Sequence, residues 1–120
     1  MSAPSTGGNK LKYYLEAIAR SKEKLDIYST NLKEMLRLKK VENNREAEAY
    51  NAIAKMETLT ESRMKDFAKK LATALDNEKY SSLPSLYLHS DLFHSRFVAL
   101  MQEVKELENS FFKIETCARN

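Results

Sequence analysis

The chain has 120 residues, of which 42% are hydrophobic and 31% are charged, and its formal net charge is +3 at pH 7. This balance is typical of a single globular or coiled-coil domain and excludes a disordered chain. Only two glycines and two prolines occur, and three of these four residues fall within the first eight positions. The rest of the chain therefore lacks the turn residues of a sheet-rich fold, and we expect it to be mainly helical.

The N-terminal segment and the single cysteine bear on location. Residues 1–9 are small and polar, and we expect them to form a disordered tail. No apolar stretch resembles a signal peptide or reaches the about eighteen residues that a membrane-spanning helix needs. Cys117 has no partner for an internal disulfide, which is typical of proteins from reducing compartments. We therefore expect a soluble cytoplasmic protein.

The first predicted helix follows this tail. Between Leu11 and Met35, apolar residues recur at alternating steps of three and four, and Ser21 is the one polar interruption. Such spacing predicts an amphipathic helix over about residues 10–41. The same heptad spacing also suits long paired helices. A rod in which the first two helices fuse and two chains pair is therefore the alternative to a compact bundle.

The stretch "RLKKVENNREAEAY", residues 37–50, decides between the bundle and the rod, and it contains neither glycine nor proline. Arg37, Lys39 and Lys40 come first and Glu46 and Glu48 follow, which is the order favoured where one helix ends and another begins. Asn43 or Asn44 can cap the new helix or take the left-handed conformation that ends the old one. We therefore predict a turn.

Two further helices are predicted after this turn. Apolar residues over 49–75 recur at a mean step of about 3.7 residues, which suits a straight amphipathic helix over about residues 45–79. Over 86–114 the steps are strictly four and three, which predicts a helix over about residues 83–116. Both helices are therefore close in length to the first.

The start of the third helix is the clearest boundary. Ser81 and Ser82 can cap it, and Pro84 lies in its first turn, where the missing N–H has no intrahelical partner. Three helices of similar length joined by short links favour antiparallel neighbours. We therefore predict an all-α fold, an antiparallel three-helix bundle with long coiled-coil-like helices, in a single domain over residues 10–118.

The third helix carries two apolar bands. Its main stripe includes Phe97 and Leu107, which we expect to be fully buried. A second band on an adjacent flank consists of Tyr87, Val98, Met101 and Phe112. An inner helix that touches two neighbours would bury both bands, whereas contiguous exposed apolar residues tend to mark a protein interface. We take the second band as the candidate site for binding another protein or a second copy of the chain.

Basic residues are concentrated in the first part of the chain. The first 45 residues hold ten Lys and Arg against five Asp and Glu, a local net charge of +5, whereas the remainder has a net charge of −2. The candidate contacts for an anionic partner are Lys33, Arg37, Lys39 and Lys40, which could meet acidic protein or anionic lipid. A solvated helix surface explains the same residues, because acidic side chains alternate with them. The overall charge of +3 argues against nucleic acid as a partner.

The sequence contains no recognisable catalytic motif. His89 and His94 are five residues apart, so a helix does not place them on one face as a metal-binding pair needs. Glycine-rich phosphate loops, cysteine pairs and nucleophile elbows do not occur. We therefore expect a protein that is not an enzyme and that binds neither a cofactor nor a metal.

Two resemblances bear on function. The segment "LTESRM", residues 59–64, is followed by a charged helix and resembles the middle of tubulin-folding cofactor A, a small three-helix bundle. This likeness covers six residues and implies a small chaperone or cofactor-type protein binder. The basic first helix and the long helices are similar in outline to the longer, membrane-curving BAR domains, which implies a membrane-surface module. The helical pattern itself favours a third interpretation, which we place first: a non-enzymatic adaptor or assembly subunit that acts through helix–helix contacts.

Overall fold

The computed structural model describes residues 7–76 and 83–119, and within them the side chains of residues 12–73 and 93–118. Its elements in chain order are α1 (Gly7–Arg37), a 3-10 turn (Asn43–Arg45), α2 (Glu46–Thr58), a π-helical segment (Leu59–Met64), α3 (Lys65–Asp76) and α4 (Leu83–Arg119). No strand occurs in the described ranges. None of the helices described is long and apolar enough to cross a lipid bilayer.

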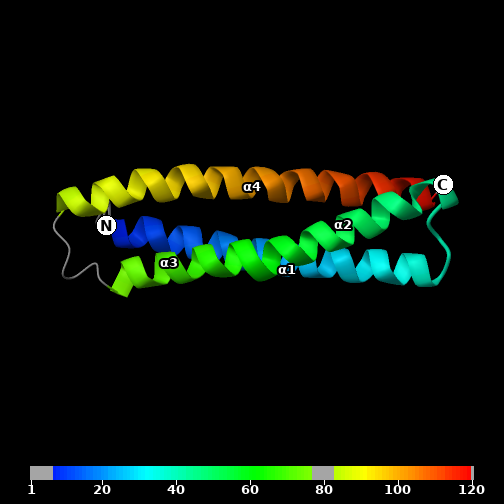
Figure 1. The fold of residues 1–120 in the computed structure, drawn as a ribbon, viewed down its shortest axis with the longest axis horizontal. Coiled ribbons are helices and arrows are strands. Elements are labelled where there is room, and N and C mark those ends of the chain that lie inside the picture. Colours follow the sequence, from blue (N-terminus) through cyan, green and yellow to red (C-terminus); the bar gives the residue numbers. More distant parts are fainter. Residues whose placement is uncertain (1–6, 77–82, 120) are drawn as a thin grey trace, which may run out of the picture.

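The helices form a bundle of three rods (Figure 1). α1 and α4 run parallel, and the continuous rod of α2, the π-helical segment and α3 runs antiparallel to both. Each rod packs against the other two, and the molecule is elongated, with extents of 56 × 30 × 18 Å. The predicted all-α three-helix bundle is therefore confirmed, and the first two helices do not fuse into one rod.

The helix bounds differ from the predicted ones at several ends. α1 begins inside the expected tail and ends about four residues early, at Arg37. α4 begins at Leu83 as predicted but continues about three residues beyond the expected end, to Arg119, because no glycine or proline stops it there. The capping roles expected of Ser81 and Ser82, and the first six residues of the expected tail, lie outside the described residues.

Lys39 makes the reversal between α1 and α2. Its φ angle is 56°, the one left-handed value among the described non-glycine residues. The N–H groups of Lys39 and Lys40 donate to the carbonyls of Leu36 and Met35, at 3.1 and 2.9 Å. This pair of hydrogen bonds is the Schellman arrangement, in which a left-handed residue ends a helix and satisfies its last carbonyls. α1 therefore ends earlier than its heptad spacing predicted.

The capping role expected of Asn43 and Asn44 is wrong. Both residues lie in the 3-10 turn, and neither the cap of that turn nor Arg45, the cap of α2, makes a side-chain capping hydrogen bond. The reversal occurs before them, at Lys39, and Val41, two residues later, is buried in the core and only 5% exposed.

Replacing Lys39 with glycine should raise the free energy of unfolding by about 1 kcal/mol. A left-handed conformation costs a residue with a Cβ roughly 1–2 kcal/mol, and glycine avoids this cost while losing some chain entropy. Urea unfolding measures the change. Lys40→Gly is the matched control, because Lys40 has the same side chain without a positive φ, and this substitution should be neutral or destabilising. Equal effects of the two substitutions would contradict a strained turn at Lys39.

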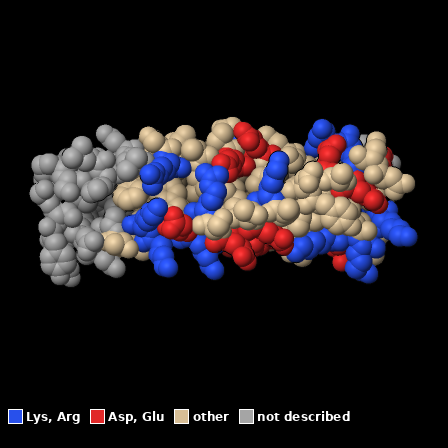
Figure 2. Space-filling view, viewed as in Figure 1, with Lys and Arg blue, Asp and Glu red and all other residues tan. Residues whose placement is uncertain are grey.

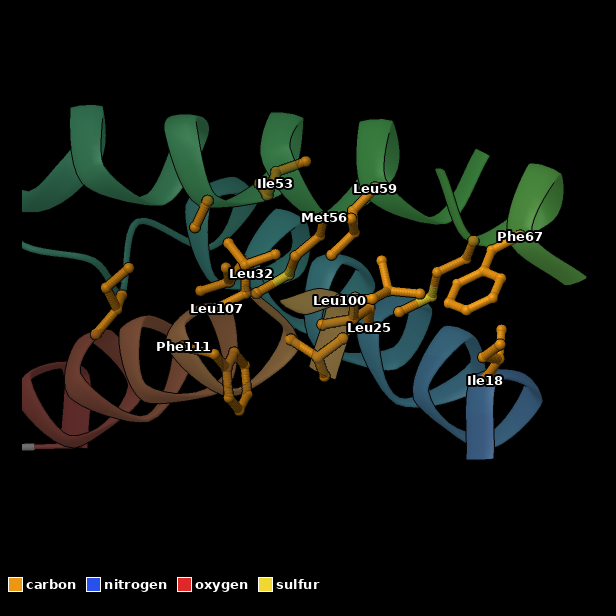
Figure 3. Packing of buried hydrophobic residues seen from close by; sticks show 14 of the residues in the cluster. Ile18, Leu25, Leu32, Ile53, Met56, Leu59, Phe67, Leu100, Leu107 and Phe111 are labelled. Carbon is orange, nitrogen blue, oxygen red and sulfur yellow. The ribbon is translucent and has the colours of Figure 1, made fainter. Parts of the chain in front are cut away.

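The core is one cluster of apolar side chains drawn from all three rods (Figure 3). Its centre includes Leu25 of α1, Met56 of α2 and Leu100 of α4, each at most 2% exposed. Phe97 and Leu107 are buried as predicted, although each is still 9% exposed. The apolar stripes of the sequence therefore identify the buried faces, and the residues between the stripes form the outer surface.

The π-helical segment absorbs one extra residue in the second rod. Up to Thr60 the buried positions follow alternating steps of four and three, and a strict continuation would bury Arg63, Phe67 and Lys70. Phe67 is buried, but Arg63 and Lys70 are exposed, and Met64 and Leu71, one residue after each of them, are 0% exposed. A wider turn with i→i+5 hydrogen bonds returns the buried face to the core after the extra residue. The sequence predicted a straight α-helix from this spacing, and the structure places a π turn in it instead.

Candidate functional site

Polar side-chain contacts join α1 to α4 along their length. Three hydrogen bonds link residues 80 positions apart: Tyr14 Oη with His94 Nδ1 at 2.7 Å, Ser21 Oγ to Met101 Sδ at 3.5 Å and Tyr28 Oη to Glu108 Oε2 at 3.0 Å. The contacts repeat every seven residues on both helices, as in a parallel coiled coil. This ladder sets the register of α1 against α4, and therefore decides which of their residues share a level on the outer surface.

Tyr28 combines ring stacking with polar contacts. Its ring stacks on Phe111 with centroids 4.4 Å apart, and Phe112 meets it edge-on at 5.6 Å. Burial raises the pKa of Tyr28 above its ordinary value, and the hydrogen bond to Glu108 and the charge of that carboxylate raise it further. Lys24 Nζ lies 3.6 Å from the same carboxylate. Phe112 therefore packs on this cluster and is also 46% exposed.

The predicted second band of α4 is divided in the structure. Val98 and Phe112 are 51% and 46% exposed. Met101 is half-buried, packs against the core and accepts the hydrogen bond of Ser21. The side chain of Tyr87 lies outside the described residues. Met101 therefore belongs to the bundle interior, and Val98 belongs to its surface.

Two exposed hydrophobic residues of α1 were not predicted as part of a candidate surface. Tyr13 and Ile27 of α1 are 58% and 49% exposed, and Tyr13 lies against Phe97 of α4 with ring centroids 6.4 Å apart. Ile27 follows Tyr13 by two heptads, so it lies on the same side of α1. The seven-residue spacing was visible in the sequence, but its meaning depends on the register of α1 against α4.

Six residues at two heptad positions define what we call the α1–α4 outer face: Tyr13, Arg20 and Ile27 on α1, and Val98, Lys105 and Phe112 on α4. All six are exposed. Six large hydrophobic side chains are exposed in the part of the chain that the structure describes, and four of them belong to this face. The exposed apolar surface is therefore concentrated on one side of the bundle.

A groove between α2 and α4 is the second candidate surface. It has a volume of about 760 Å³, and Leu59, Leu107 and Ile114 contribute to its apolar floor. These three side chains are at most 9% exposed, and an ion pair between Arg63 and Glu103, which both line the groove, spans it. The groove therefore offers less apolar surface to a partner than the α1–α4 outer face does.

Two of the predicted contacts for an anionic partner are engaged within the bundle. Lys33 Nζ lies 2.5 Å from a carboxylate oxygen of Glu57, and Arg37 pairs with Glu34 at 2.6 Å. The hydrogen bond between Arg37 and Glu34 lowers the pKa of the carboxyl and raises the pKa of the guanidinium. These pairs are exposed, so they add little stability, but they reduce the charge available to a partner.

The other two basic residues of that set are not held in ion pairs, although the charge of Lys40 also lowers the pKa of Glu34. Lys39 and Lys40 are exposed and make no ion pair within the described ranges. Figure 2 shows one side of the bundle, on which basic and acidic side chains are interspersed along its length. Charges mixed in this way do not create the surface of one sign that an anionic membrane attracts. On the side that Figure 2 shows, the mixture of charges favours a solvated surface.

Of the two histidines, the structure describes the side chain of His94 alone. It is hydrogen-bonded to Tyr14 in the ladder between α1 and α4. The side chain of His89 lies outside the described residues. Within those residues, no three His, Cys, Asp or Glu side chains gather closely enough to hold a metal ion.

No family model, curated protein or solved structure matches the chain. The likeness to tubulin-folding cofactor A therefore rests on residues 59–64 alone and stays a prediction. Those residues form the π-helical segment. The geometry of the α1–α4 outer face is therefore the basis for proposing a function.

Proposed function

We propose that the chain is a non-enzymatic, intracellular adaptor or assembly subunit whose α1–α4 outer face binds a helix of another protein. The observation that carries the proposal is the gathering of four of the six exposed large hydrophobic side chains on this face. Scattered exposed apolar residues are ordinary, whereas exposed apolar residues gathered on one face tend to mark an interaction site. Two parallel helices with apolar residues at heptad spacing form the surface that a third amphipathic helix packs against.

The size of the patch indicates a reversible contact. Each of the four apolar side chains is about half exposed, so covering it would contribute roughly 1 kcal/mol, about half of what full burial gives. The sum of about 4 kcal/mol does not support an obligate interface, because association also loses translational and side-chain freedom. The partner must therefore add polar contacts, or several such contacts must act together.

Replacing Ile27 and Val98 together with glutamate should abolish partner binding and leave the bundle folded. Neither residue packs against the core, so the double substitution should change the free energy of unfolding by about 1 kcal/mol or less. It would place two charges in an apolar interface, where unpaired burial is costly. Tyr50→Glu is the matched control, because Tyr50 is as exposed but lies on α2, away from this face.

A photo-crosslinking side chain at Tyr13 measures binding in cells, and the same group at Tyr50 reports on non-specific contacts. We expect a defined protein adduct from position 13 that disappears in the Ile27→Glu/Val98→Glu variant and persists with Tyr50→Glu. Circular dichroism melting verifies that each variant is folded. Equal adducts from both positions, or adducts from Tyr13 that survive the double substitution, would contradict the proposal.

A further inference from the structure

The α1–α4 outer face is organised in three layers. Each layer pairs a residue of α1 with the residue 85 positions later on α4, and successive layers are seven residues apart: Tyr13 with Val98, Arg20 with Lys105, and Ile27 with Phe112. The face is therefore apolar at both ends and basic in the middle. Its two apolar layers are 14 residues apart, which is about 21 Å along a helix.

Arg20 and Lys105 of the middle layer are exposed, and neither makes an ion pair with the residues that the structure describes. Glu16 and Glu23 lie one helical turn before and after Arg20 but are not paired with it. Glu108, one turn after Lys105, is paired with Lys24 instead. A partner that covered both apolar layers would also cover these two cations, and covering an unpaired charge is strongly unfavourable.

We propose that the partner helix carries apolar side chains two heptads apart and carboxylates midway between them. This inference rests on the proposed function and specifies the chemistry of the partner. The apolar side chains would pack on the layers of Tyr13 with Val98 and of Ile27 with Phe112. The carboxylates would pair with the basic layer, so the contact would combine apolar burial with charge complementarity.

A second copy of the chain does not meet this requirement. A two-fold interface uses the same surface on both partners. Bringing two α1–α4 outer faces together would place Arg20 and Lys105 of one copy against the same two residues of the other. Like charges across an interface cost several kcal/mol. The basic layer therefore selects against self-association through this face and in favour of an acidic helix.

Two synthetic amphipathic helices test the charge requirement. Both have two leucines two heptads apart; one has two glutamates midway between them, and the other has two lysines there. At low salt and neutral pH, fluorescence anisotropy should show that the chain binds the acidic peptide about tenfold more tightly, since each exposed ion pair contributes modestly. The Arg20→Glu/Lys105→Glu variant should reverse the preference. Lys39→Glu/Lys40→Glu is the control, because it changes the net charge equally at exposed positions at the end of α1 and should keep the preference.

The other outcomes overturn the inference in distinguishable ways. Equal binding of the two peptides that is lost in Ile27→Glu/Val98→Glu would leave the proposed function intact and refute the charge requirement. Binding of neither peptide would refute the proposed chemistry of the partner helix, and the crosslinking at Tyr13 would then decide the proposed function separately. A concentration-dependent dimer that requires Ile27 and Val98, seen by sedimentation equilibrium, would identify a second copy as the occupant. Binding to anionic vesicles lost in Arg20→Glu/Lys105→Glu would identify lipid.

Discussion

Replacing Phe97 with alanine should lower the free energy of unfolding by about 3–5 kcal/mol, because the substitution removes buried apolar area and leaves a cavity. Phe97 is 9% exposed, and its ring stacks on Tyr14 with centroids 4.6 Å apart. Tyr14 is itself 2% exposed and hydrogen-bonded to His94, so little around the site can collapse into the space. A small domain has about 5–15 kcal/mol of stability, and the loss is therefore a large fraction of the total.

The adjacent Val98 provides the control for this substitution. It is 51% exposed, one residue further along α4, and Val98→Ala should change the free energy of unfolding by about 0.5 kcal/mol or less. Urea unfolding of the two variants measures the difference, and the Phe97→Ala variant should also melt at least about 10 °C lower. Similar values for the two variants would show that the stripe containing Phe97 does not face the core.

The predicted stripes succeeded where periodicity alone decides the structure. α4 is the clearest case, because its buried positions from Phe97 to Ile114 keep alternating steps of three and four. Any register of the bundle buries such a stripe, so its partner helices need not be known. The same reasoning identified Val98 and Phe112 as residues beside the stripe, and both are exposed.

The predictions failed in two kinds of place. In one, a residue adopts a conformation that its type does not favour, and in the other, the structure depends on contacts between segments far apart in the sequence. Lysine does not favour the left-handed conformation, so nothing in the sequence marked Lys39 as the residue of the reversal. Asparagine does visit that conformation, and the prediction therefore pointed to Asn43 instead. The extra residue before Met64 appeared in the sequence only as a slightly longer mean step. Tyr13 and Arg20 could not be joined to the face of α4 without the register that the α1–α4 hydrogen bonds set.

Deletion of Gln102 from α4 should unfold the protein. The helix has no irregular segment at this point, so removing one residue turns everything after it by about 100°. Four buried side chains of α4 follow the deletion: Val104, Leu107, Phe111 and Ile114. Losing a buried large side chain costs about 2–5 kcal/mol, so losing the four together exceeds the stability of most small domains. Far-UV circular dichroism should show the loss of cooperative melting.

Deletion of Ser62 from the π-helical segment is the matched experiment, and it should leave the protein folded. Ser62 is exposed, and the segment already contains one residue more than the heptad spacing requires. Without that residue the segment can close into a regular α-helix, and Met64 and Leu71 take the heptad positions that follow Thr60, whereas the buried Phe67 gives its position to Ala68. We expect the free energy of unfolding to fall by about 2–4 kcal/mol, mostly through Phe67, with the helix content retained. Unfolding by both deletions alike would mean that the π turn does not compensate for an inserted residue, and that the second rod is held in register by contacts other than its heptad stripe.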